Sequence, residues 1–275
     1  MNVVADLHIH TTASDGRFSP AECVAKATAL GLRAIAVTDH DTMAGVAEAQ
    51  AAATSLAVLS GVEFGCHWDN RPEIEVHILG YGCTADHPEL AAELQALRNA
   101  RDSRAEATVS KLASLGLTID LADVMRLAGG GSVGRPHIAQ ALLERGYVDS
   151  VADAFSRYLS PGKPGYVGHY RLSTQRAIEL ITLAGGVPVL AHPGLIGNAG
   201  VVAAVICQGI RGIEVWHPQH TPADVRFYRR LARQRGLLAT GGSDFHGIGP
   251  DGSELGSCGV ALEQLVDLQT AVASA

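Results

Sequence analysis

The feature that most constrains this sequence is a repeated pattern in which a short apolar run ends in histidine, aspartate or glutamate. The run ends read DLHIH, TDHD, GVE, EVH, AHP, WH and SDFH, starting at residues 6, 38, 61, 75, 191, 216 and 243. The runs have the length of buried strands and alternate with helix-like segments, a pattern typical of βαβ units. In a barrel of such units the strand ends meet on one face. We therefore expect an α/β barrel with these side chains gathered at its mouth.

Seven segments are predicted as strands, namely 3–8, 34–38, 57–60, 75–80, 187–191, 212–216 and 237–240. Two of the helices between them have clear start signals, because Ser19 and Thr221 are each followed by a proline and, three positions on, by an acidic residue. No barrel strand is expected between residues 81 and 186, where helical spacing dominates. The sequence therefore predicts a barrel built from residues 1–85 and 166–275, with a helical insertion over 86–165 covering its mouth.

Histidine and carboxylate pairs at the run ends predict a metal site. Alternate residues of a strand point to the same side, so His8 and His10 can reach one ion together. Asp244 and His246 repeat this spacing. Glu63 lies in an apolar context, where a carboxylate must be paired or neutralised, and bound cations would do this. Imidazole and carboxylate ligands suit Mn, Zn or Fe(II), and the absence of cysteine from the set argues against a structural thiolate zinc site.

Composition excludes several other classes of protein. The 275 residues carry 21 Lys and Arg against 28 Asp and Glu, a net charge of −7, so the overall field does not favour nonspecific nucleic-acid binding. No apolar run approaches the ~20 residues of a membrane helix, and no secretory signal is visible. The five cysteines are scattered and never form a C-x-x-C pair, so we expect reduced thiols in a cytoplasmic protein. Nothing in the sequence calls for an obligate protein partner.

Taken together, the motifs D-x-H-x-H-T-x-x-S-D-G, T-D-H-D, G-x-E, V-H-I-L-G-Y, A-H-P-G and G-G-S-D-F-H resemble those of the PHP (polymerase and histidinol phosphatase) family over nearly the whole chain. The run GRPHIA at residues 134–139 further resembles the TrpH-like branch. That branch contains 3′,5′-nucleotide bisphosphate phosphatases, some of which also act as 5′-end exoribonucleases. The resemblance implies a distorted (β/α)7 barrel of PHP type that holds two or three divalent ions.

The resemblance also implies the ligands of each ion. The first ion would be held by His8, His10, Glu63 and Asp244. Glu63 would bridge to a second ion that is completed by His77 and His192. The third would be held by Asp15, His40 and His246.

Many family members have histidine where this chain has Asp15. Because aspartate is the harder ligand, we expect Mn2+ ahead of Zn, Fe or Mg. The predicted catalytic residues are His40, His246 and Asp244, with His40 or His246 in proton transfer at the leaving oxygen. Metal-activated hydroxide is the expected nucleophile.

Arginines in the predicted insertion favour a substrate with a second phosphate. Arg101 and Arg104 interrupt the apolar stripe of the first long helix, and we predict a phosphate contact at Arg104, helped by Ser103. Alternatively, these arginines lay their stems over the barrel and extend their charged ends to water. We also predict phosphate contacts at Arg135 and His137, which begin a later helix whose N-terminus attracts anions.

The sequence thus predicts a phosphoric monoester hydrolase that removes the 3′-phosphate of 3′,5′-nucleoside bisphosphates such as pAp, leaving a 5′-nucleotide. The first alternative is a 5′-3′ exoribonuclease on short 5′-phosphorylated RNA. The others are a small-molecule phosphatase such as histidinol phosphatase, a deacetylase or other amidohydrolase on a similar barrel, and a noncatalytic nucleic-acid-binding or metal-storage module. The expected partner is a small nucleotide, with short RNA as the second candidate.

Overall fold

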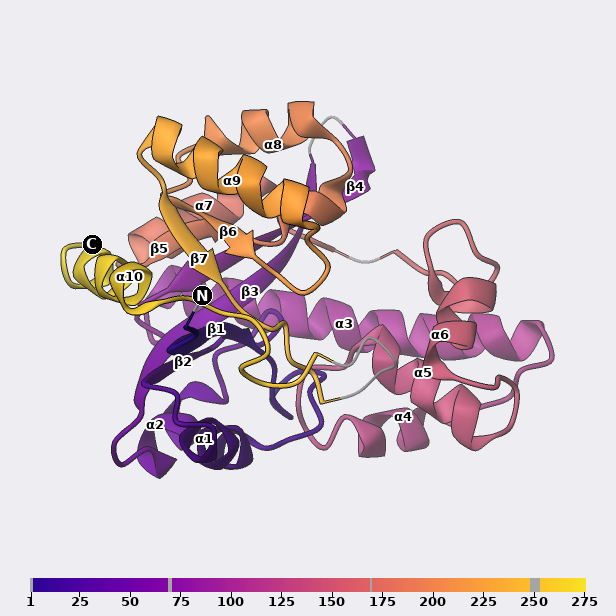
Figure 1. Cartoon of the computed structure of the whole chain (residues 1–275). Helices are drawn as coiled ribbons and strands as arrows, with labels where there is room; N and C mark the ends of the chain where they lie inside the picture. Colours follow the sequence, from indigo (N-terminus) through magenta and orange to yellow (C-terminus); the bar gives the residue numbers. More distant parts are fainter. Residues whose placement is uncertain (1, 69–70, 169, 248–252) are drawn as a thin grey trace.

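The structure is a computed structural model, and it describes residues 2–68, 71–168, 170–247 and 253–275. Seven strands form one sheet in the order of the sequence, and the sheet curls into a nearly closed barrel (Figure 1). The strands are β1 (Ala5–Ile9), β2 (Ala34–Val37), β3 (Ala57–Trp68), β4 (Arg71–Tyr81), β5 (Val187–Leu190), β6 (Gly212–Trp216) and β7 (Leu238–Gly241). This architecture confirms the predicted α/β barrel.

The direction of β4 departs from the uniformly parallel pattern. Strands β1 to β3 and β5 to β7 pair in parallel, whereas β4 pairs antiparallel with both β3 and β5. A parallel pair needs a crossover of a dozen or more residues. Because β3 ends at Trp68 and β4 begins at Arg71, no crossover fits between them. Both strands are also longer than predicted, since they pair with each other beyond the barrel wall.

Six helices accompany the barrel strands. They are α1 (Pro20–Ala29), α2 (Val46–Ala52), α7 (Thr174–Leu183), α8 (Ala199–Ile206), α9 (Pro222–Arg235) and α10 (Leu262–Ala273), with a short 3-10 turn, η2 (Pro193–Ile196). The predicted starts of α1 and α9 are confirmed, because Ser19 and Thr221 each accept a hydrogen bond from a backbone N–H three residues on and complete a capping box. In the described residues no helix is both long and apolar enough to cross a bilayer.

A group of helices between β4 and α7 lies beside the barrel (Figure 1). It consists of α3 (Pro88–Ser114), α4 (Leu121–Leu127), α5 (Arg135–Glu144), α6 (Val151–Ala154) and the π-helical turn η1 (Phe155–Leu159). We call residues 88–159 the helical group. The first half of α3 packs Leu90 and Leu97 into the barrel's apolar cluster, and its second half packs Ala105 and Leu112 into a separate cluster with the other helices. Helix α3 therefore joins two apolar cores.

Candidate metal centre

Strand β1 delivers two buried imidazoles to the end of the barrel. The side chains of His8 and His10 are fully buried, and their rings lie 5.2 Å apart. The His8 Nε2 atom is 3.4 Å from both Glu63 Oε2 and Asp244 Oδ1, and the His10 Nε2 atom is 3.3 and 3.1 Å from the same two oxygens. The close approach depends on Gly242, because a Cβ there would clash with the backbone of His8. These four side chains offer ligand atoms within 4.8 Å of one another.

Glu63 lies at the centre of the cluster, with a fully buried side chain. Its Oε1 atom accepts hydrogen bonds from His77 Nδ1 at 2.8 Å and His192 Nε2 at 3.0 Å. Its Oε2 atom is 2.9 Å from His40 Nδ1, in addition to its contacts with β1. Five imidazoles thus surround one carboxylate. A carboxylate with ligands on both oxygens is suited to bridging two cations.

A third ligand group lies on the side of the cluster that faces the helical group. Asp15 Oδ1 is 3.4 Å from His246 Nε2, and Asp15 Oδ2 is 3.9 Å from His40 Nε2. With His10, these residues again offer atoms within 4.8 Å of one another. The loop that carries Asp15 is held by the buried Asp39, which accepts hydrogen bonds from the hydroxyls of Thr11 and Ser14 at 2.7 and 2.6 Å and from the Thr11 amide.

The cluster contains buried polar atoms that no described residue of the chain satisfies by a hydrogen bond. Within the residues that the structure describes, six of its atoms make no hydrogen bond of normal geometry, although some of them lie close to one another: His8 Nε2, both ring nitrogens of His10, Asp15 Oδ1, His40 Nδ1 and Glu63 Oε2. Buried polar groups are normally hydrogen-bonded, so such a concentration requires an explanation. Nitrogen and oxygen atoms that converge without partners are what divalent cations need. The donor set therefore fits metal ions.

The electrostatics of the cluster also favour cations. Burial alone would raise the pKa of the Glu63 carboxyl, but His8, His40 and His77 outweigh it and hold that pKa well below its usual value. Burial opposes the charge of His77 too, yet Glu63 and Glu75 raise the pKa of His77 to about 10. Asp15 and Asp244 likewise raise the pKa of His246 to about 10 against burial. The carboxylates thus favour the protonated forms of His77 and His246, in positions where metal ions would supply the positive charge.

Backbone strain is concentrated at the same place. In the described residues only Asp41, His192 and Asp244 combine a side chain with a positive φ, at 53°, 23° and 51°. Such conformations cost about 1–3 kcal/mol each and persist where the surroundings enforce them. Two of these residues belong to the predicted ligand set and the third follows His40. The strain points to a site whose geometry is maintained at the expense of local stability.

Two buried carboxylates hold the ligands in place: Glu214, which sequence reasoning missed, and Asp6, which it quoted in the D-x-H-x-H motif without assigning a role. Glu214 on β6 contacts His8 Nδ1 at 3.1 Å and accepts a hydrogen bond from the backbone N–H of His192 at 2.8 Å. Asp6 accepts hydrogen bonds from the amide and hydroxyl of Ser243 at 2.9 and 2.6 Å. Such partners fix ring orientation and tautomer in metal sites. An acidic residue within an apolar strand was the available signal for Glu214.

A cavity of about 240 Å³ opens from this cluster toward the helical group. Besides predicted metal ligands, the charged residues that line this cavity are Glu75, Arg101, Arg104, Arg135 and Arg171. Arg101 forms a buried ion pair with Asp41, at 2.5 Å from Nη2 to Oδ2. Burial, then the charges of Arg101 and Arg135, lower the pKa of Arg104 to about 9. A cavity with this lining is complementary to a polyanion.

Of the four predicted substrate contacts, two line the cavity and two do not. Arg104 and Arg135 line the cavity, whereas Ser103 is exposed and His137 is not among the lining residues. His137 instead accepts a hydrogen bond at Nδ1 from the Gly134 amide, at 3.0 Å, and so caps its own helix. Sequence reasoning did not select Arg171, which approaches Glu75 at 3.5 Å from beyond the helical group. No motif marked Arg171.

The nine residues expected to bind metal therefore converge at one barrel mouth, beside an arginine-lined cavity. The PHP domain model matches residues 6–160 of the chain. The chain belongs to the PHP family.

Two curated relatives and one solved structure are similar to this chain over most of its length. The 3′,5′-nucleoside bisphosphate phosphatase of Chromobacterium violaceum is 36% identical over 259 residues, covering 91% of this chain and 90% of the relative. The 5′-3′ exoribonuclease Rnm of Escherichia coli is 36% identical over 253 residues, covering 89% of this chain and 85% of the relative. A Bifidobacterium adolescentis structure, provisionally described as a metal-dependent phosphoesterase, superposes with a TM-score of 0.91 at 31% identity, covering 98% of this chain and 97% of that one. Relatives of this branch thus carry two nucleotide-directed activities.

Proposed function

We propose that this protein is a metal-dependent phosphoesterase that hydrolyses the 3′-phosphate of 3′,5′-nucleoside bisphosphates such as pAp. The observation that carries the proposal is the unsatisfied ligand cluster opening directly into an arginine-lined cavity. One phosphate of the substrate would lie at the cluster and the other among the arginines. The names of both curated relatives support a nucleotide or RNA substrate.

The nine-residue cluster would hold two or three divalent ions. We assign His8, His10, Glu63 and Asp244 to the first, Glu63 with His77 and His192 to the second, and Asp15, His40 and His246 to the third. When bound, such ions neutralise phosphate oxygens and lower the pKa of a bound water toward neutrality. Asp15 adds a hard oxygen donor to the third position, which favours Mn2+ there over Zn.

The residues of the chain would orient the substrate and manage protons. His246 donates from Nδ1 to the backbone carbonyl of Asp244 at 2.8 Å, which leaves its Nε2 facing Asp15 and the cavity. His40 has a carboxylate near each ring nitrogen. With two ions bound and the third position empty, so that the His246 Nε2 atom is not a metal ligand, we propose this histidine, the more exposed of the two, for proton transfer to the leaving oxygen, with Asp244 holding the His8 and His10 rings in place.

The helical group would act as the substrate cap, corresponding to the insertion expected over 86–165. Arg101, Arg104 and Arg135 all reach the cavity from this group. It would therefore select substrates by their second phosphate while the barrel carries the metal ions. The cysteines are all free thiols, which supports the expected cytoplasmic location.

The proposed activity is tested with purified protein and a panel of phosphate esters in the presence of Mn2+, Zn2+ or Mg2+. We expect phosphate release from pAp with kcat/KM at least 10-fold above that for AMP or histidinol phosphate, because the latter two have only one phosphate to divide between metals and arginines. The readout is phosphate release together with identification of the nucleotide product as AMP. Equal rates on histidinol phosphate and pAp would refute the nucleotide assignment.

Arg135→Ala tests the second phosphate position. The Arg135 side chain lies over the rings of Phe155 and Tyr166, at 5.7 and 5.9 Å, so its guanidinium is held at the cavity. A charged hydrogen bond to phosphate contributes about 1.5–3 kcal/mol, so we expect KM for pAp to rise about 10- to 100-fold. Metal content should not change, because Arg135 is outside the ligand cluster.

The matched control is Arg157→Ala, which removes an arginine of the same helical group whose ion-pair partner is Asp153. It should leave KM for pAp within twofold of the wild type. An unchanged KM in Arg135→Ala would remove Arg135 from the phosphate position.

A further inference from the structure

Helix α9 carries a stripe of arginines on its exposed side. Arg226, Arg229, Arg230 and Arg233 are spaced at i, i+3, i+4 and i+7, so they lie within one face of the helix. All four are exposed, while Tyr228 and Ala232 face the barrel. We call these four residues the α9 stripe.

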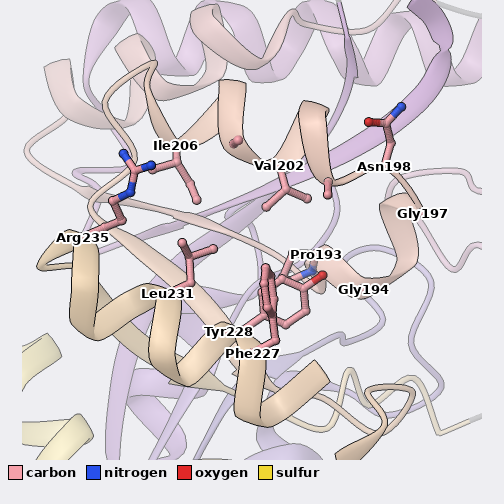
Figure 2. A pocket seen from close by; sticks show the side chains of 12 residues that line it. Pro193, Gly194, Gly197, Asn198, Val202, Ile206, Phe227, Tyr228, Leu231 and Arg235 are labelled. Carbon is pink, nitrogen blue, oxygen red and sulfur yellow. The ribbon is translucent and has the colours of Figure 1, made fainter. Parts of the chain in front are cut away.

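The α9 stripe is not part of the groove between α8 and α9. That groove has a volume of about 340 Å³ and is lined by Val202, Ile206 and Leu231 among others (Figure 2). The fifth arginine of the helix, Arg235, lines this groove (Figure 2). At 3.6 residues per turn its position falls on the side of α9 away from the stripe. The stripe is therefore a distinct, solvent-facing surface of one charge.

The charge of the stripe is not balanced by carboxylates. In the described part of the chain its four guanidinium groups form no salt bridge, as is also true of the exposed Arg17, Arg33, Arg211 and Arg235, whereas four other exposed arginines are paired. Arginines paired with carboxylates are Arg126, Arg145, Arg157 and Arg176. The chain as a whole has a net charge of −7, so an uncompensated cationic surface runs against its composition. Such a surface attracts anionic partners.

An aromatic side chain accompanies the stripe. The side chain of Phe227 lies at the border between the stripe and the groove: it is among the residues lining the groove (Figure 2), yet it is 44% exposed, although a phenylalanine gains from burial. The Arg230 guanidinium lies 6.0 Å from the centre of its ring. Exposed aromatic rings beside arginines are the combination that binds single-stranded nucleic acid, because rings stack on bases and guanidinium groups bind phosphates in a bidentate way.

A chain of ring contacts connects the buried face of α9, on the side of the helix opposite the stripe, to the metal centre. His217 Nε2 is 3.4 Å from Asp244 Oδ2. The His217 ring lies 5.4 Å from His220, and His220 lies 5.3 Å from Tyr228 on α9. Asp244 and these three rings are not among the residues that line the arginine cavity. The buried face of α9 is therefore connected to the cluster through His217 and His220, on a side other than the cavity.

From this arrangement we propose that the α9 stripe binds the phosphate backbone of single-stranded RNA whose 5′ end occupies the arginine cavity. The inference rests on the proposed function, because it assumes that a 5′-phosphate lies in the cavity and a 3′-linked phosphate at the metal cluster. The nucleotides that follow must then leave the cluster on a side other than the cavity. The stripe spans about 10 Å at 1.5 Å per residue, long enough to contact more than one phosphate of a strand.

The test compares a short and a long substrate. The variant R226Q/R229Q/R230Q/R233Q should hydrolyse pAp with KM within twofold of the wild type, because pAp does not reach α9. For a 5′-phosphorylated 12-nucleotide RNA, its KM should rise 10-fold or more. Binding of the same RNA to chelated, metal-free protein, followed by fluorescence anisotropy, should weaken likewise. The slope of log Kd against log salt should fall by up to about 3, since each lost phosphate contact contributes about 0.7 for single strands.

The matched control is R126Q/R145Q/R157Q/R176Q, which removes the same amount of charge from arginines that already have carboxylate partners. It should bind RNA as the wild type does. Equal losses in both variants, or none in the stripe variant, would overturn the inference. So would stripe-dependent binding to phosphatidylglycerol vesicles with unchanged RNA binding. A wild type inactive on pAp would instead contradict the proposed function, and the anisotropy measurement would still decide the role of the stripe.

Discussion

Glu63→Gln is expected to abolish phosphate release and to remove most of the bound metal. Glu63 is the single carboxylate that approaches His8, His10, His40, His77 and His192, and its side chain is fully buried. A glutamine has the same shape but offers a neutral oxygen and an amide group that repels cations. Metal ions contribute several kcal/mol of transition-state stabilisation, so kcat/KM for pAp should fall about 10³-fold or more.

The measurement pairs kinetics with metal analysis. Metal per protein is determined by mass spectrometry after dialysis against Mn2+, and thermal unfolding shows that the variant is folded. The control is Glu106→Gln, an exposed glutamate of α3 that is not in the cluster. It should retain both metal and activity. Retention of metal and of more than a tenth of the activity in Glu63→Gln would contradict the central role of this carboxylate.

Most of the ligand cluster was predictable because its members follow apolar runs, whereas Asp15, in the loop after the first strand, was predicted only from the resemblance to the PHP family. In a barrel, the run length fixes where a strand ends, and strand ends converge without any knowledge of pairing. This is why His8, Glu63 and Asp244, which are far apart in the chain, could be grouped from the sequence. The direction of β4 was harder to predict, because strand periodicity carries no information about which way a neighbouring strand runs.

The substrate side was less predictable, because it depends on how the helical group packs against the barrel. The Arg171–Glu75 contact joins the segment after that group to β4, and no local pattern signals it. Ser103 is a different case. It lies two positions from Arg101 on one helix, and residues at that spacing do not share a face. The helical spacing therefore already argued against placing Ser103 beside the arginines.

The largest effect on stability is expected from Arg101→Met. The Arg101 atoms Nη2 and Nε lie 2.5 and 2.7 Å from Asp41 Oδ2, and both side chains are nearly buried. Breaking a buried pair leaves an uncompensated charge and costs about 3–5 kcal/mol. We expect a loss of this size in the free energy of unfolding, measured by urea denaturation. Arg98→Met on the same helix, which loses one hydrogen bond to the Gly130 carbonyl, should cost about 1 kcal/mol.

A second substitution separates the charge effect from simple loss of packing. The double variant Asp41→Asn, Arg101→Met removes both charges, so it should be more stable than Arg101→Met alone, with a coupling of about 1–3 kcal/mol. Because α3 carries Arg101 to Asp41 and Arg104 to the cavity, loosening this contact should also displace Arg104 and raise KM for pAp. Asp41 follows His40, so metal content is measured in the same samples. If Arg101→Met and the double variant were equally destabilised, the ion pair would not be what fastens the helical group to the metal-binding barrel.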